Sequence, residues 1–105
     1  MNYKLAHIGV PTTFQQPNET FVEGLSVYLT DPDQHPYSYE YLRFVPGTPL
    51  PDILTKQNHV AYYVDNLETA MKDGHLIVEP MEVSETRRIA FIVKDGLPME
   101  LIEDK

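Results

Sequence analysis

Apolar and polar residues alternate over several short stretches of the chain, and most of these stretches end at proline, glycine or aspartate. Alternation with a period of two residues is typical of a strand that has one buried face. The pattern predicts strands over residues 5–10, 25–29, 37–45, 58–64, 76–83, 88–93 and 98–103. The second and third of these flank a turn-rich break, so we expect them to form an antiparallel hairpin.

Signals for helices are few. Asp65 and Glu68 have the spacing of a capping box, which predicts a brief helix that continues to about Asp73. Residues 11–24 are short and rich in proline, and they predict a connection with at most one helical turn. Residues 46–57 hold three prolines and a glycine, which predicts a linker.

The order of the predicted elements indicates an internal duplication. His7 stands early in the first strand, and His59 stands early in the strand that opens the second half. Glu40 and Glu100 lie in the strands that end the two halves. Each half therefore has the order strand with histidine, crossover, hairpin, strand with glutamate.

Strand parity places these four residues on matching faces, because successive side chains point to opposite sides of a strand. If the halves pair into one curved sheet, two imidazoles and two carboxylates can converge on it. Buried carboxylates are costly, and a divalent cation would offset that cost. The set suits zinc, nickel, cobalt, manganese or ferrous iron without distinguishing among them. The alternative is that the histidines are satisfied by backbone or solvent and that the glutamates face water.

Composition narrows the classes of partner. The net charge of −8 argues against nucleic acid and anionic membranes, which require a basic face. The absence of cysteine excludes disulfides, cysteine-ligated metals and thiol catalysis. No apolar run has the length of a membrane span, and no signal-peptide pattern follows the start. We therefore expect a cytoplasmic single domain over residues 1–105, although composition identifies no substrate.

Four stretches of the chain together carry a family pattern: LAHIGV, YEYLRF, NHVAYYVDNLETA and RIAFIVKDGLPMELIEDK. They resemble the vicinal oxygen chelate superfamily, which includes glyoxalases, epimerases, fosfomycin-resistance proteins, extradiol dioxygenases and bleomycin-binding proteins. The resemblance implies an α+β fold of two βαβββ-type modules that form a curved mixed sheet with an open cleft. Module 1 would span about residues 1–46 without most of its helix, followed by a linker over about 46–57 and module 2 over about 58–105.

The resemblance also implies a metal centre and a reaction. By position the family's four ligands fall on His7, Glu40, His59 and Glu100, a set most similar to that of glyoxalases. The implied activity is that of a lyase or isomerase that acts on an α-oxygenated carbonyl compound through a metal-bound enediolate. Glu100 or Glu40 would be its general base. The arginine that glyoxalases carry soon after the first histidine is absent, which leaves the use of glutathione open.

Two other functions remain as alternatives on the same fold. One is a metal-free ligand-binding protein of the bleomycin-resistance kind, and the other is a dioxygenase or epimerase variant. For substrate contacts the candidates are Tyr63, on the face of His59, and Arg88, which could hold an anionic group. His35 is expected at the surface, and the alternating Tyr37, Tyr39 and Tyr41 on the sheet surface or at a dimer interface. Because the family typically dimerises, we expect a homodimer.

Overall fold

The computed structural model describes residues 2–105. Within them the fold is α+β, as the sequence predicts, and it has eight strands, two short α-helices and two 3₁₀ turns. By its internal contacts the chain divides into two compact units. The N-terminal unit is His7–Asn58, and the C-terminal unit is His59–Lys105 together with the chain up to Ala6.

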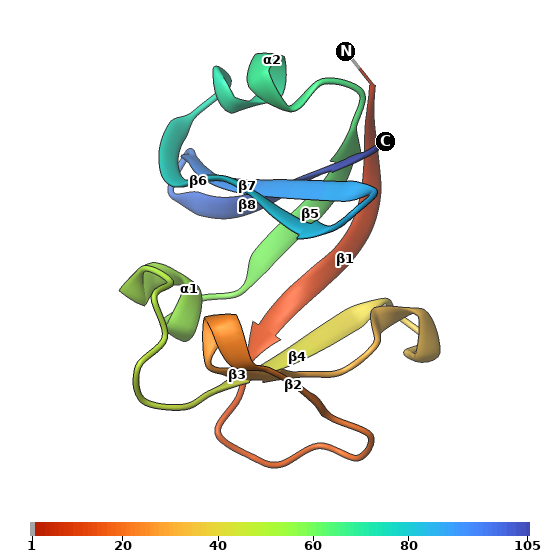
Figure 1. Ribbon diagram of the computed structural model, residues 1–105, viewed down its shortest axis with the longest axis vertical. Coiled ribbons are helices and arrows are strands. Elements are labelled where there is room, and N and C mark those ends of the chain that lie inside the picture. The colour runs from red at the N-terminus through yellow and green to blue at the C-terminus, as the bar shows by residue number, and fades with distance from the viewer. Residues whose placement is uncertain (1) are drawn as a thin grey trace. The chain divides into compact units, whose positions relative to one another are not determined.

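The N-terminal unit holds a mixed sheet (Figure 1). Its strands are β1 (Tyr3–Pro11, whose first residues belong to the C-terminal unit), β2 (Thr20–Val22), β3 (Val27–Leu29) and β4 (Tyr39–Phe44). Their order is β2-β3-β4-β1. β1 and β4 are parallel, while β3 is antiparallel to both β2 and β4. The predicted hairpin of β3 and β4 is thus confirmed, whereas β2 was not predicted.

The connections of this unit contain only short helical pieces: η1 (Glu23–Leu25), η2 (Pro32–Gln34) and α1 (Asp52–Lys56). No helix joins β1 to β2, as expected for that proline-rich segment. The segment over residues 46–57, which the sequence predicts as a linker, contains α1. This helix follows Pro51 directly, where proline's fixed φ favours a helix start, and it buries Leu54 to 1% exposure.

The C-terminal unit repeats the pairing of the first (Figure 1). Its strands are β5 (His59–Val64), β6 (His75–Ser84), β7 (Arg87–Lys94) and β8 (Leu97–Asp104). β5 is parallel to β8, and β7 is antiparallel to β8 and β6, just as β1 is parallel to β4 and β3 is antiparallel to β4 and β2. The structure therefore confirms the two modules. The tight turn between β7 and β8 uses Asp95 and Gly96, both at positive φ.

One face of this second sheet is covered by α2 (Leu67–Met71), a helix that the first unit lacks. The buried residues of this core are Val64, Leu67, Ala70, Ala90, Ile92 and Leu101. The helix exists where the sequence predicts it but ends two residues earlier. None of the helices within residues 2–105 has the length and apolar character needed to cross a bilayer.

The cap of α2 differs from the predicted one. Asn66, not Asp65, is the N-cap residue, and its side-chain oxygen accepts a hydrogen bond from the backbone N–H of Thr69 at 2.8 Å. Glu68 does not complete a capping box, because its carboxylate binds Arg88. Glu103 accepts the N–H of Leu67 at 2.9 Å instead. The start of the helix is thus set partly by a residue of β8.

We expect Asn66→Ala to lower the free energy of unfolding by about 1 kcal/mol, because the Thr69 N–H loses its acceptor. The measurement is urea denaturation followed by circular dichroism. Asp65→Ala is the matched control and should change stability by less than half as much. Equal losses in the two variants would contradict the assignment of Asn66 as the cap.

Candidate functional site

The N-terminal unit places a histidine against a glutamate on its two parallel strands. Gly9 of β1 stands beside Glu40 of β4 in the strand register, and His7 lies two residues before Gly9 on the same face. The side chains therefore meet, with Nε2 of His7 3.4 Å from Oε1 of Glu40. His7 is buried to 7% exposure, and Glu40 is half-buried.

The C-terminal unit contains the corresponding pair. Ala61 of β5 stands beside Glu100 of β8, and His59 lies two residues before Ala61. Nε2 of His59 is 3.2 Å from Oε1 of Glu100. His59 is only 1% exposed, and the ring of Phe91 meets its imidazole edge to face at 5.4 Å between centroids. Phe91 is the β7 neighbour of Glu100, so it shields this pair from solvent.

The two pairs have the same construction. In both, a parallel strand pair sets the glutamate opposite the second residue after the histidine, and the same atoms, Nε2 and Oε1, approach each other. All four residues are of types that could hold a metal ion. A buried carboxylate requires positive charge or donors nearby, and a divalent cation could be bound by Nε2 and Oε1 together.

The chemistry of these donors fits some metals better than others. Imidazole nitrogen with carboxylate oxygen suits zinc, manganese, iron, cobalt and nickel. Calcium prefers six or more oxygens, and monovalent copper prefers sulfur, so both fit this set poorly. A histidine that ligates through Nε2 must be neutral and carry its ring proton on Nδ1.

Arg88, a candidate substrate contact, lies among carboxylates of its own unit. Its guanidinium donates to Glu68 at 2.9 and 3.0 Å and to Glu103 at 2.7 Å. These hydrogen bonds raise the pKa of Arg88 above its ordinary value. The pKa of Glu103 is lowered, first by the Leu67 N–H and then by Arg88. A substrate anion would have to displace two carboxylates to bind here.

Tyr63, the other candidate contact, lies beside a second ion pair. The guanidinium carbon of Arg87 is 5.5 Å from the centroid of the Tyr63 ring. Arg87 also donates to both carboxylate oxygens of Asp104, at 2.7 and 3.1 Å, which lowers the pKa of Asp104. These contacts hold the phenol ring of Tyr63 at a defined position on β5.

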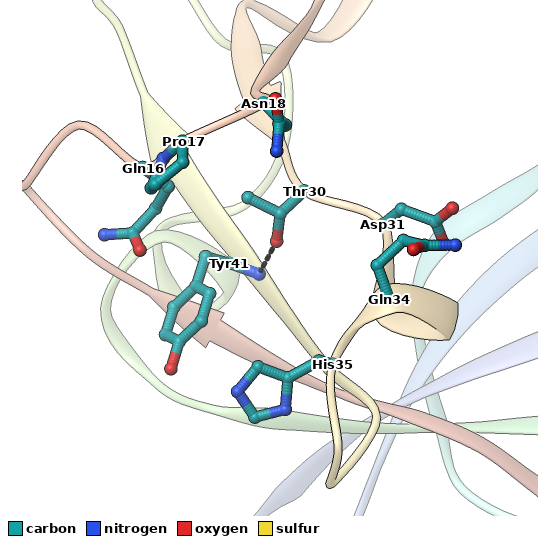
Figure 2. Close-up of a pocket in the computed structure, with 8 residues that line it drawn as sticks. All are labelled: Gln16, Pro17, Asn18, Thr30, Asp31, Gln34, His35 and Tyr41. Atoms are coloured by element: carbon teal, nitrogen blue, oxygen red, sulfur yellow. Dashed lines mark hydrogen bonds between the residues drawn. The ribbon is translucent and has the colours of Figure 1, made fainter.

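The N-terminal unit also holds a pocket that the sequence does not predict, since the pattern favours His35 at the surface and Tyr41 on the sheet surface or at an interface. Figure 2 shows it, and its volume is about 410 Å³. The lining residues are Gln16, Pro17, Asn18, Thr30, Asp31, Gln34, His35 and Tyr41. They come from three separate segments, so no local pattern in the sequence marks the pocket.

Comparisons with known proteins support the fold and assign no function. No family model matches the chain, and no curated protein matches it. A crystal structure of the hypothetical protein BH1468 from Bacillus halodurans C-125 is similar, with a TM-score of 0.68 and 18% sequence identity. The similarity covers 100% of this chain and 96% of that one. At this level of identity it shows a shared fold.

Proposed function

We propose that the protein is a metal-dependent lyase or isomerase of the glyoxalase type, in which both His–Glu pairs bind one divalent cation. The observation that carries the proposal is the repetition of the pair, His7 with Glu40 and His59 with Glu100, in the same register of the two units. The resemblance of the four strand segments to the vicinal oxygen chelate superfamily points the same way. The proposed substrate is a small α-oxygenated carbonyl compound.

Each residue of the proposed site would have a separate role in the reaction. His7, His59, Glu40 and Glu100 would hold the cation, which would supply Lewis acidity to two adjacent oxygens of the substrate. A carboxylate oxygen of Glu100 would take the proton from the carbon next to the carbonyl and return it to the neighbouring carbon. Phe91 would limit the access of water to Glu100, so that the same proton is returned.

The first test is metal content and activity of protein purified without a histidine tag. After treatment with EDTA, the chain is reloaded separately with each of the five candidate metals. It is then assayed on the hemithioacetals that methylglyoxal forms with small thiols and with glutathione. We expect one bound ion per chain and activity that depends on the metal. Uptake of less than about a tenth of an equivalent of every metal would contradict the proposal.

Glu100→Gln tests the role of the base. We expect kcat to fall by about 10²- to 10⁴-fold, because an amide cannot accept the substrate proton. Glu79→Gln, an exposed glutamate of β6, is the matched control and should leave both metal content and kcat unchanged. Ligand binding that survives EDTA without any turnover would favour the metal-free binding protein instead.

A further inference from the structure

The pocket of Figure 2 lies where the first module lacks the helix that the second one has. In the C-terminal unit, α2 connects β5 to β6 and covers Leu101, the residue after Glu100. In the N-terminal unit, the residue after Glu40 is Tyr41, and the segment that connects β1 to β2 is a short loop. That loop supplies Gln16, Pro17 and Asn18 to the pocket wall, and Tyr41 remains half-buried beneath it.

The aromatic side of the pocket is fixed in place. Nδ1 of His35 accepts hydrogen bonds from the backbone N–H groups of Tyr37 and Tyr39, at 3.1 and 3.4 Å. The ring of Tyr39 stacks on the imidazole with centroids 4.7 Å apart and planes at 14°. Because Nδ1 is an acceptor, neutral His35 carries its proton on Nε2 and is a donor there. Tyr41 meets the imidazole edge to face, 5.8 Å between centroids (Figure 2).

The polar side of the pocket is also ordered. Oγ1 of Thr30 accepts the backbone N–H of Tyr41 at 2.8 Å, which leaves its own proton to donate elsewhere. The carboxylate of Asp31 accepts the N–H of Asp33 at 2.9 Å and so caps η2. Gln16, Asn18 and Gln34 add amides that can both donate and accept.

Charge and volume restrict what can bind. Among the lining residues that the structure describes, the only formal charge is the negative one of Asp31, and no lysine or arginine is present to hold a phosphate. A volume of about 410 Å³ lies in the range of small-molecule sites. An aromatic ring wall with amides and a carboxylate around it suits a flat ring that carries N–H donors.

We propose that this pocket binds a neutral or cationic planar nitrogen heterocycle of nucleobase or nucleoside size, with its ring against Tyr41 and the negative charge of Asp31 at the edge of the site. The site is separate from the proposed metal centre. Glu40 and Tyr41 are adjacent on β4, so their side chains point to opposite faces of the sheet. Binding should therefore be the same with and without metal.

The test is titration of the full chain with adenosine, cytidine and AMP, followed by ¹H–¹⁵N NMR and repeated in EDTA. We expect both nucleosides to bind with a Kd below about 1 mM and AMP to bind no more tightly than adenosine. EDTA should leave the Kd of each ligand unchanged. The result of this titration is therefore independent of whether the proposed metal centre binds an ion. No shift of the pocket residues at about 5 mM nucleoside, or much tighter binding of AMP, would overturn the proposal.

Two substitutions, each with a matched control, test whether the nucleoside binds in this pocket. Tyr41→Leu should weaken nucleoside binding by about 5- to 150-fold, the range expected for the loss of a base–aromatic contact. Asp31→Asn keeps an N-cap side chain for η2 and should weaken binding by removing the charge. Tyr37→Leu and Asp33→Asn alter neighbours that do not line the pocket and should bind as the wild type does. Unchanged affinity in both pocket variants would overturn the proposal.

Discussion

Replacing Leu101 with alanine is expected to lower the free energy of unfolding by about 2–5 kcal/mol. Leu101 has 0% exposure and belongs to the core cluster that α2 covers, together with Leu67, Ala90 and Ile92. The substitution loses the burial of three carbon atoms and leaves a cavity that rigid β-sheet neighbours cannot close. The measurement is urea denaturation followed by circular dichroism and by tyrosine fluorescence.

Leu97→Ala provides the control on the same strand. Leu97 is 40% exposed, so the same change in chemistry should cost less than about 1 kcal/mol. Similar losses in the two variants would mean that the cluster under α2 is not the core of the C-terminal unit. If fluorescence and circular dichroism gave different midpoints for Leu101→Ala, the two units would be unfolding separately.

The sequence predicts most strands and the shared face of each His–Glu pair because both depend on the two-residue period of a strand. His7 and Glu40 occupy matching parities of their strands, and a parallel register then brings them into contact. His59 and Glu100 follow by the same rule in the second module. What parity does not supply is the register itself, which depends on the pairing of whole strands.

Elements of three to five residues were missed or placed inexactly for a physical reason. β2 is too short to show alternation, and α1 buries a single leucine, Leu54, so neither has a periodic pattern. Asp65 and Asn66 are both good cap residues, and local sequence does not choose between them. The choice depends on Glu103 and Arg88, which lie far along the chain and occupy the N–H of Leu67 and the carboxylate of Glu68.

The pocket also cannot be predicted from local sequence, because it depends on segments that are distant along the chain. A tyrosine stripe along β4 is visible in the sequence, but its role depends on what lies over it. In the second module a helix covers the equivalent residue, Leu101, and in the first a loop of eight residues, 12–19, leaves Tyr41 accessible. Only a comparison of the two folded modules reveals that the first lacks the cover that the second has.

The variants His7→Ala and His59→Ala are each expected to abolish metal binding, so that the number of ions bound per chain falls from one to zero in both. A single shared ion would lose one of its ligands in either variant, and the remaining set would bind at least about 100-fold more weakly, because removing even an outer partner of a ligand costs 10- to 100-fold. The measurement is elemental analysis after dialysis together with calorimetric titration of zinc. His75→Ala, at the exposed start of β6, is the control and should retain one ion.

The stoichiometry distinguishes one shared site from two separate ones. If each His–Glu pair bound its own ion, the wild-type chain would bind two ions and each single variant would still bind one. The duplication alone permits either result, because each unit contains a complete pair. One shared ion is favoured by ligand number: two protein ligands leave a zinc ion short of the three or four that protein sites provide, whereas both pairs together supply four. Retention of one ion by His7→Ala, at wild-type affinity, would therefore contradict the proposed metal centre.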